Sequence, residues 1–493
     1  MSGIALNDTT LPEIAGAAVP AYHRGGIRTG IVHFGVGGFH RAHQAMYLDR
    51  LLALDPDAAA WGICGVGLRP ADAAMRDALA PQDGLYTLTL KHPDGTVETS
   101  VIGSIVHYLY APDDPEAVIE TLASPHVRIV SLTVTEGGYN FSASTGEFDA
   151  ENPDVAADLA PGAVPRTVFG YVAEALRRRR DRQLPAFTVM SCDNIEGNGH
   201  VARRTFLAFA RLADPELAQW MDAEVAFPNS MVDRITPATP PDLRAEVAQR
   251  SGVDDRWPVV AEPFTQWVLE DSFASGRPAL ERVGVQVVDD VAPYELMKLR
   301  LLNAGHQALG HFARLLGYEY VHDAAVDPDI RELLRRYMQE EGRPTLREVP
   351  GIDLDEYIDT LLDRFSNPAI ADTVARLCQD ASDRIPKWLV PVIAARLDAG
   401  AQAPLAAAVV AAWTRCSEGR SDDGAPLDIS DRLAGGLAER AVRSRTERLA
   451  FVENTELFGD LADRPGFTEP YVAALDAIRE HGTRAALRDL VAR

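Results

Sequence analysis

The 493-residue chain is poor in cysteine. Its four cysteines, Cys64, Cys192, Cys378 and Cys416, lie far apart, and none belongs to a CxxC pair. A structural zinc site usually takes closely spaced cysteines, and a disulfide framework takes several at regular spacing. The sequence therefore excludes a thiolate zinc site of the usual pattern and gives no disulfide framework.

Positive charge is also scarce. There are 48 Lys and Arg against 72 Asp and Glu, which gives a net charge of −24. Binding to nucleic acid requires a basic face, so we expect no nucleic-acid partner. The one basic run, residues 177–180, is flanked by Glu174 and Asp181, and we expect it on the solvated face of a surface helix.

Long apolar runs are absent as well. No stretch reaches the ~20 apolar residues that a membrane-spanning helix needs, and the N-terminus lacks the basic and apolar regions of a secretory signal. With 46% hydrophobic residues the chain can bury a large core. We expect a cytoplasmic protein with no membrane partner and, because no heptad pattern is present, a monomer.

The first half of the chain predicts a Rossmann-type α/β domain over residues 1–290. A β-prone run at 31–34 is followed by the glycine-rich GVGGFH, a helical period at 45–52 and a second strand at 61–68, which together make a βαβ unit. The stretch 85–110 alternates around Asp94-Gly95, as a β-hairpin does. Further strands are predicted at 127–136 and 185–194, with a helix between them.

Residues 291–493 are predicted to be a mostly helical domain. The segments are rich in Ala, Leu, Arg and Glu, and breaks that carry Pro344, Pro350 and Pro386 separate several of them. Two domains imply a cleft between them, and we expect the active site there.

The glycine-rich turn resembles a dinucleotide-binding motif in which His40 takes the place of the third glycine. In such a turn the glycines allow a tight bend and a close approach of the pyrophosphate to the backbone. The candidate cofactor-binding residues are Gly35, Gly37, Gly38, Phe39 and His40.

The acidic residue that holds the cofactor ribose is expected after the second strand. Asp72 is the candidate, although it comes later than the usual interval, and the nearby Arg69 leaves NADP possible. His40 and His43 are spaced like metal ligands, but no third ligand is near, so packing is the preferred interpretation and no metal is expected.

The segment YELMKLRLLNAGH (294–306) places Lys298, Asn303 and His306 in an apolar helix. At 100° per residue the three share one broad face, with Asn303 about 140° from Lys298. Lys298 could reach solvent, pair with Glu295 or be desolvated. A desolvated lysine is a base near neutral pH, and Asn303 with Asn194, which we expect to be a buried asparagine after a strand, could hold a developing oxyanion.

These motifs together resemble the long-chain mannitol dehydrogenase family. The resemblance runs from about residue 28 to the C-terminus and is carried by GVGGFHRAHQA (35–45), SLTVTEGGY (131–139), SCDN (191–194), FPNSMVDRITP (227–237) and KLRLLNAGH (298–306). It implies a zinc-independent, NAD-dependent secondary-alcohol dehydrogenase that acts on polyols.

The resemblance also implies roles for single residues. Lys298 matches the general base, Asn194 and Asn303 the pair that polarises the reacting oxygen, and Glu295 a gate that passes the proton to solvent. His306, Asp233 and Arg376 match substrate contacts. Many family members have lysine at the position of Arg384, so whether Arg384 or Lys387 faces the substrate stays open, and exchanging lysine for arginine changes the recognition geometry. From the residues alone, an Asp233–Arg234 ion pair and a surface Arg376 are the alternatives.

The implied reaction interconverts D-mannitol and D-fructose. Alternatives within the family are D-arabinitol, D-sorbitol or a uronate such as fructuronate. From other classes, the alternatives are a non-catalytic NAD-binding sensor and a zinc-dependent alcohol dehydrogenase, and the scattered cysteines argue against the latter.

Overall fold

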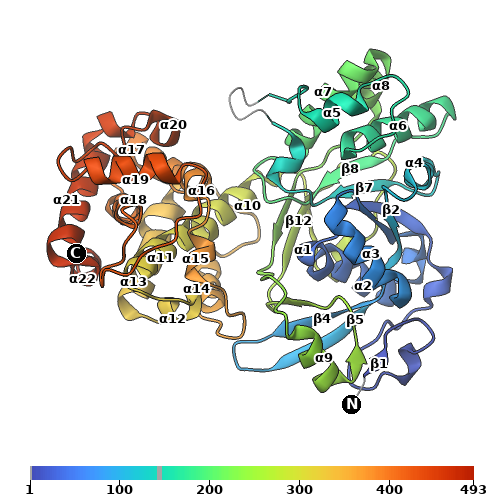
Figure 1. Cartoon of the computed structure of the whole chain (residues 1–493), viewed down its shortest axis with the longest axis horizontal. Coiled ribbons are helices and arrows are strands. Elements are labelled where there is room, and N and C mark those ends of the chain that lie inside the picture. Colours follow the sequence, from blue (N-terminus) through green and yellow to red (C-terminus); the bar gives the residue numbers. More distant parts are fainter. Residues whose placement is uncertain (1–2, 142–146) are drawn as a thin grey trace. The chain divides into compact units, whose positions relative to one another are not determined.

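A computed structural model describes residues 3–141 and 147–493 (Figure 1). The chain divides into two compact units, Met1–Ala292 and Pro293–Arg493, which we describe separately. The sequence places this boundary between residues 290 and 291.

A five-stranded parallel sheet forms the centre of the first unit. Its strands are β2 (Thr29–Phe34), β3 (Gly62–Gly67), β6 (Ile105–Tyr110), β7 (Ile129–Leu132) and β8 (Thr188–Ser191). Their order is β6-β3-β2-β7-β8. β3 and β6 lie on one side of β2, and β7 and β8 lie on the other, so the strand order switches direction between β2 and β7. This is the arrangement of a Rossmann-type fold.

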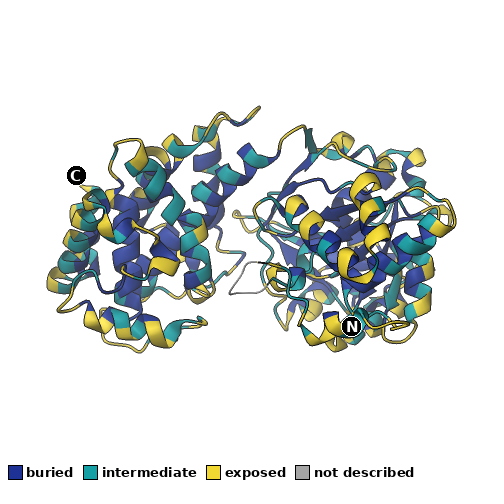
Figure 2. Ribbon diagram, turned by 90° about the horizontal axis from the view of Figure 1, so that it is seen from above, coloured by how far each residue is buried: buried dark blue, intermediate teal, exposed yellow. Residues whose placement is uncertain are grey.

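Both faces of this sheet are buried, which explains why its strands are almost continuously apolar. Val32 and Val130 face one core, and their neighbours Ile31 and Ile129 face another. Helices α4 (Pro115–Ala123), α6 (Val168–Asp181), α7 (Asn198–Ala213) and α8 (Pro215–Glu224) contribute to the first core, and α2 (Gln44–Leu54) and α3 (Ala73–Leu79) to the second. Figure 2 shows this buried interior.

The helix predicted after the glycine turn is broken. α1 (Gly38–Ala42) ends at His43, where φ is −124° and ψ is −89°, and α2 begins at Gln44. The His43 ring makes a hydrogen bond with the Gln266 carbonyl at 2.9 Å. This contact ties the break to strand β12 (Gln266–Glu270), an interaction that helical periodicity does not reveal.

Smaller sheets complete the first unit. The predicted hairpin is formed by β4 (Tyr86–Lys91) and β5 (Val97–Ile102), and β11 (Val259–Ala261) extends it. The last part of the predicted hairpin region is instead β6 of the central sheet. The other elements are β1 (Ile4–Ala5), β9 (Ser230–Asp233), β10 (Val253–Asp254), β12, β13 (Gln286–Val288), α5 (Pro153–Asp158) and α9 (Leu243–Ser251).

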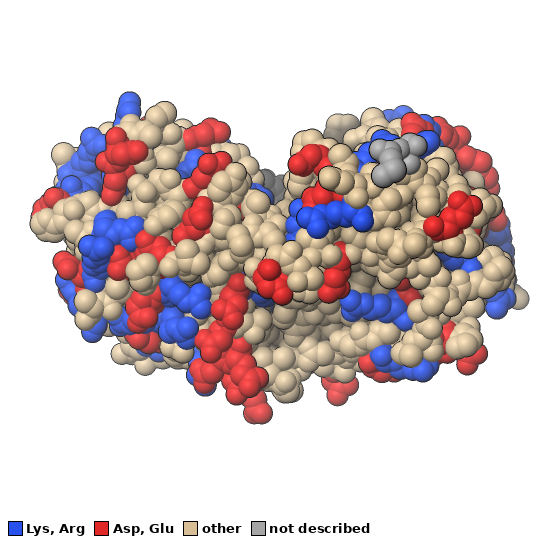
Figure 3. All heavy atoms as spheres, turned by 90° about the horizontal axis from the view of Figure 1, so that it is seen from below, with Lys and Arg blue, Asp and Glu red and all other residues tan. Residues whose placement is uncertain are grey.

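The basic run on α6 is only partly solvated, as Arg179 shows. Its side chain is buried and donates to the carbonyls of Pro185, Ser124 and Val127 at 2.7–2.9 Å. The guanidinium therefore satisfies loop carbonyls that would otherwise be buried without partners. Arg177 and Arg178 pair with carboxylates, including Glu174. Figure 3 shows acidic and basic side chains interspersed on the face that it presents.

The described part of the second unit is helical. Before residue 350 it contains α10 (Ala292–Met297), a π-helical turn η8 (Lys298–Asn303), α11 (Ala304–Leu315), α12 (Val321–Ala325), α13 (Pro328–Arg336) and a second π-helical turn η9 (Tyr337–Gly342). It continues with α14 (Leu354–Phe365), α15 (Val374–Leu377), α16 (Ala381–Trp388), α17 (Val390–Asp398), α18 (Pro404–Cys416), α19 (Ala434–Arg443), α20 (Thr455–Phe458), α21 (Pro465–His481) and α22 (Thr483–Val491).

Helix α18 is the core of this unit. Nearly all its residues are buried, and α11 and α21 pack against it. Pro386 does not separate helices as the sequence predicts, because it lies inside α16, which ends two residues later at Trp388. Among the described residues, no helix has both the length and the apolar character needed to cross a bilayer.

A buried histidine in α11 makes stability depend on pH. His311 is 1% exposed, and neither ring nitrogen has a hydrogen-bond partner among the described residues. Burial lowers the pKa of His311 to about 3. The unfolded chain binds a proton on this residue below about pH 6.5, so the free energy of unfolding must fall as pH drops from about 6.5 towards 3.

Replacing this ring with an apolar side chain should remove its share of the pH dependence. We expect His311→Leu to be neutral or stabilising at pH 7, because it removes unsatisfied polar atoms. Between pH 7 and pH 5 the wild type should lose about 2 kcal/mol more stability than the variant. Urea unfolding at both pH values measures this. His481→Gln, at an exposed histidine, is the control, and equal losses in wild type and His311→Leu would contradict the prediction.

Candidate active site

The glycine turn begins immediately after β2. Gly35 has φ of +90°, and a Cβ placed on it would lie 2.1 Å from the Thr133 carbonyl oxygen. Only glycine fits this position, because both the dihedral and the neighbouring backbone exclude a side chain. The Thr133 hydroxyl donates to the Gly35 carbonyl at 2.7 Å, which links the turn to the segment after β7.

The second glycine of the motif faces open space. Gly37 is exposed, and the nearest atom to a Cβ placed on it would be the Gly35 carbonyl oxygen at 3.8 Å. Gly38 would meet only ordinary contacts at 3.6 Å and beyond. The protein itself therefore does not require glycine at 37. A ligand that lies against this backbone does, because a side chain would occupy its space.

Phe39 and His40 pack against different rings. Phe39 stacks on His43, with ring centroids 4.9 Å apart. His40 is 1% exposed and stacks on His33 at 3.5 Å, so any contact it makes with a ligand in the turn would be through its backbone.

The stacked histidines are both neutral. Burial lowers the pKa of His33 to about 3 and that of His40 well below its ordinary value. His33 is held by Ser131 Oγ at 2.8 Å and Thr133 Oγ1 at 2.9 Å. The two rings thus act as packing between the glycine turn and β7.

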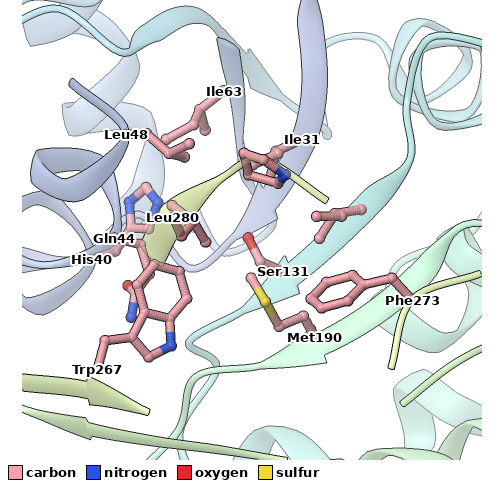
Figure 4. Close-up of a pocket in the computed structure, with 12 residues that line it drawn as sticks. Ile31, His40, Gln44, Leu48, Ile63, Ser131, Met190, Trp267, Phe273 and Leu280 are labelled. Carbon is pink, nitrogen blue, oxygen red and sulfur yellow. The ribbon is translucent and has the colours of Figure 1, made fainter. Parts of the chain in front are cut away.

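The core of the first unit contains an apolar pocket, drawn in Figure 4. His40, Gln44, Ser131, Met190 and Trp267 line it together with aliphatic side chains. Its lining comes from the central sheet, α2, β12 and residues 273–280, and Gly37 is not among the residues that line it. Across residues 3–141 and 147–493, no cluster of three or more His, Cys, Asp or Glu is arranged to hold a metal ion.

Asp72 lies just beyond the carboxyl end of β3. Its Oδ2 accepts the backbone N–H groups of Leu68 and Arg69, both at 2.9 Å. Arg69 is exposed, and its guanidinium is 3.7 Å from Asp72 Oδ1. The carboxylate is therefore held at the end of the strand next to β2, which is where a ribose-binding acid belongs in this fold.

The parallel sheet places several predicted residues at one edge. Gly35 follows β2, Asp72 follows β3, and Asn194 follows β8, and the carboxyl ends of parallel strands meet on the same side. Asn194 is exposed and not buried as predicted. The buried asparagine in this stretch is Asn198, which donates to the carbonyls of Asp193 and Ser230 at 2.9 and 2.7 Å.

Asp193 is a site residue that the sequence motifs did not single out. Its carboxylate accepts the backbone N–H groups of Val134 at 3.1 Å and Thr135 at 2.8 Å, and the Tyr139 hydroxyl at 2.8 Å. Burial raises its pKa. Asp193 therefore joins the segment after β7 to the start of the segment that carries Asn194.

The bonds to Asp193 hold a strained backbone. Thr135 has φ of 64° and ψ of 171°, a region that is essentially restricted to glycine. Such strain persists only where surrounding contacts determine the conformation, and it concentrates at functional sites. In the sequence, the position of Asp193 next to the candidate Asn194 could have pointed to it. A positive φ at Thr135 leaves no signal in the sequence.

Asp233 is the last residue of β9 and is 3% exposed. It lies opposite Gln266 of β12. Its neighbour Arg234 donates to the carbonyls of Glu262 at 2.9 Å and Ala42 at 2.6 Å, so the guanidinium binds backbone carbonyls.

In the second unit the lysine segment is not a regular α-helix. Lys298–Asn303 is a π-helical turn between α10 and α11, and the Ala304 N–H donates to the Leu299 carbonyl five residues earlier. The turn accommodates one extra residue, so Asn303 comes close to lying above Lys298 and not about 140° away as α-helical geometry predicts. The prediction of an unbroken α-helix was wrong, and the correction brings the two side chains closer to one face.

Lys298, Asn303 and Glu295 are all buried, with 5–7% of each exposed. Asn303 Nδ2 is fully buried and has no hydrogen-bond partner among the described residues. A buried amide donor without a partner costs stability, and such a group in a native protein requires an explanation. An explanation that fits the place of Asn303 beside Lys298 is that its amide donates a hydrogen bond to a bound ligand. His306, one turn further on, packs against Phe365 with ring centroids 4.4 Å apart.

Two arginines lie together on α15 and α16. Arg376 is exposed, and its Nε donates to Asp372 Oδ1 at 2.5 Å. Arg384 Nη1 donates to the carbonyls of Arg376 at 3.1 Å and Leu377 at 3.2 Å. These bonds fix Arg384 beside Arg376. Lys387, on the same helix, is exposed.

The arginine pair is also tied to α11. Gln307 of α11, the residue after His306, donates to the Leu377 carbonyl at 3.0 Å, and Leu377 also accepts from Arg384. The second unit thus gathers the lysine segment, His306 and both arginines on connected elements. The first unit gathers the glycine turn, Asp72, Asp193 and Asn194 at the edge of the sheet.

Comparison with known proteins gives matches along almost the whole chain. Residues 29–282 match the family model described as mannitol dehydrogenase Rossmann domain, and residues 290–479 match mannitol dehydrogenase C-terminal domain. Mannitol 2-dehydrogenase of Phaeosphaeria nodorum is 47% identical over 98% of this chain and 85% of its own. That of Aspergillus fumigatus is 44% identical over 99% of both.

Two solved structures are similar over their whole length. Pseudomonas fluorescens mannitol 2-dehydrogenase, in a ternary complex with NAD and D-mannitol, has a TM-score of 0.89 and 45% identity, covering 99% of this chain and 100% of the other. A D-sorbitol dehydrogenase in substrate-free form has a TM-score of 0.91 and 40% identity, covering 98% of this chain and 100% of the other.

The first two glycines of the turn should respond differently to the same substitution. We expect Gly35→Ala to destabilise the first unit by at least about 2 kcal/mol, because the Cβ would be strained and would clash with the Thr133 carbonyl. Gly37→Ala should change stability by no more than about 0.5 kcal/mol. Calorimetry of the two variants measures this difference. Similar losses in both would contradict this account of the turn.

Proposed function

The chain belongs to the mannitol dehydrogenase family, and we propose that it oxidises D-mannitol to D-fructose with NAD. The observation that carries this proposal is the buried pair on η8, in which the amide donor of Asn303 has no partner among the described residues and lies one π-turn from Lys298. A base and a neutral hydrogen-bond donor on one face are what the oxidation of an alcohol requires.

The first unit has features that fit a bound dinucleotide. The open space over Gly37 suits a pyrophosphate close to the backbone, and a Cβ there would intrude on it. Asp72 would hold the ribose hydroxyls from the end of β3. A carboxylate at this place favours NAD over NADP, since it repels a 2′-phosphate. Bound NAD supplies the hydride acceptor.

Lys298 acts as the general base in this proposal. Its neutral amine takes the proton from the C2 hydroxyl, while the C2 hydrogen departs as hydride with its electron pair and the C–O bond becomes a carbonyl. In reduction of the ketose, the protonated amine returns the proton to the oxygen. In this proposal Glu295, one turn earlier on α10, passes that proton towards solvent.

Asn303 and Asn194 polarise the reacting oxygen. Negative charge grows on this oxygen as the proton leaves, and an amide N–H stabilises it without adding a competing charge. His306 and Asp233 would bind other hydroxyls of the polyol. Arg376 would do the same, with its guanidinium oriented by Asp372.

D-Mannitol is the proposed substrate because proteins named for that activity match almost the whole chain. D-Sorbitol is the second candidate, since the D-sorbitol dehydrogenase structure is equally similar in fold. Initial rates on D-mannitol, D-sorbitol, D-arabinitol and fructuronate, each with NAD and NADP, would rank the substrates.

Removing the lysine tests the base. We expect Lys298→Ala to lower kcat for mannitol oxidation by at least about 100-fold and to abolish the rise of kcat with pH, because general-base catalysis contributes rate only when the base is neutral. Absorbance of the reduced nicotinamide measures the rate. Lys91→Ala, which removes a lysine paired with Glu246 at 3.0 Å, is the control and should behave as wild type. Near-normal turnover by Lys298→Ala would refute the assignment.

The choice between Arg384 and Lys387 can be settled by steady-state kinetics. We expect Arg384→Ala to raise the KM for mannitol about tenfold with no change in the KM for NAD, since Arg384 is fixed beside Arg376. Lys387→Ala should leave both values unchanged, because in this assignment Arg384 makes the substrate contact. The opposite pattern would assign the substrate contact to Lys387.

A further inference from the structure

The π-helical turn η8 removes one carbonyl from its usual place in the helical ladder. In an α-helix the Ala304 N–H would donate to the Arg300 carbonyl four residues earlier. It donates instead to the carbonyls of Leu299 and Leu301. The Arg300 carbonyl therefore depends on a group outside the helix, because a buried carbonyl left without a hydrogen bond is costly.

Tyr337 supplies that hydrogen bond. Its hydroxyl donates to the Arg300 carbonyl at 2.9 Å. The side chain is 0% exposed, and burial raises the pKa of Tyr337 well above its ordinary value, so the hydroxyl keeps its proton and remains a donor.

A second residue of the same segment also packs against the π-helical turn η8. Gly342 lies so close that a Cβ on it would be 3.2 Å from the Arg300 carbonyl oxygen and 2.9 Å from Leu301 Cδ2. Tyr337 and Gly342 are the first and last residues of η9, itself a π-helical turn. Two π-helical turns thus pack on one another, and the contact is centred on one carbonyl.

A buried glutamate holds η9 against helix α18. Glu341 is buried, and its carboxylate accepts the N–H groups of Leu405 and Ala406, at the start of α18, at 2.7 and 2.8 Å. Helix α18 is the core of the unit, so η9 cannot easily follow a movement of η8. The segment that supports the Arg300 carbonyl is therefore anchored to α18.

We propose that Tyr337 is a positioning residue for catalysis: its hydroxyl holds the Arg300 carbonyl and so maintains the π-helical turn that sets Asn303 over Lys298. This inference rests on the proposed function, because it assigns Tyr337 a role through the base and the oxyanion donor. Without the hydroxyl, the Ala304 N–H can return to Arg300, and an α-helical register would turn Asn303 away from Lys298.

The test is Tyr337→Phe, which removes one oxygen atom and keeps the ring. We expect kcat for mannitol oxidation to fall at least about tenfold and the midpoint of its pH profile to shift, with the KM for NAD within about twofold of wild type. A misplaced catalytic group costs rate and leaves cofactor binding intact. A crystal structure of the variant should show the Ala304 N–H on the Arg300 carbonyl.

Tyr471→Phe is the matched control. Tyr471 is likewise a fully buried tyrosine of the second unit, and its hydroxyl bonds to Thr414 Oγ1 at 3.0 Å. This variant should lose similar thermal stability with unchanged kcat and pH profile. Gly342→Ala, which presses on the Arg300 carbonyl, should reproduce the kinetic changes of Tyr337→Phe and serves in its place should that variant not fold.

Two results would overturn the inference. One is wild-type kcat and pH profile in Tyr337→Phe, and the other is a crystal structure in which the π-helical turn persists although activity falls. Failure of the proposed function looks different, since then the wild-type enzyme would show no NAD-dependent oxidation of mannitol, or Lys298→Ala would remain active, whatever the register of the turn in Tyr337→Phe.

Discussion

The hydrogen bond from Tyr337 to the Arg300 carbonyl is the interaction on which, in our proposal, the geometry of the π-helical turn η8 depends. A helix that takes up one extra residue must find an external partner for the carbonyl it displaces. With that partner in place, Lys298 and Asn303 share a face in an otherwise apolar segment. Burying both side chains costs stability, and the proposed reaction explains why that cost is tolerated, because both groups act on the reacting oxygen.

In the first unit, the controlling constraint is the parallel sheet. Its strand order brings the segments after β2, β3, β7 and β8 to one edge, and buried polar groups then join these segments to each other. His33 connects the glycine turn to β7, and Asp193 connects the segment after β7 to Asn194. The strain at Thr135 is held by the same carboxylate, and such strain concentrates at functional sites.

In the proposed function, specificity for the polyol depends on a smaller group of residues. Arg376 is oriented by Asp372, and Arg384 is fixed by the carbonyls of Arg376 and Leu377. A planar guanidinium with fixed donors recognises hydroxyl positions differently from a flexible lysine amine. Under the proposed function, Arg384 is therefore the place to look for a change in accepted substrate.

Sequence alone predicted the parallel α/β unit, the helical unit and the glycine turn, because these follow from apolar periodicity and from short local motifs. The proposed reacting side chains came from the resemblance to the mannitol dehydrogenase family, since helical geometry by itself left the role of Lys298 open. It did not determine the break at His43, the burial of Arg179 or the π-helical turn. Each of these depends on a partner far away in the chain: Gln266, the carbonyls around residue 124, and Tyr337. The prediction that Asn194 is buried was also wrong, since exposure at the edge of a sheet depends on what the rest of the unit covers. The sequence thus supplies the lysine and the asparagine of the proposed site, whereas the tertiary structure decides that they face the same way, because only a folded neighbour can satisfy the carbonyl that the turn displaces.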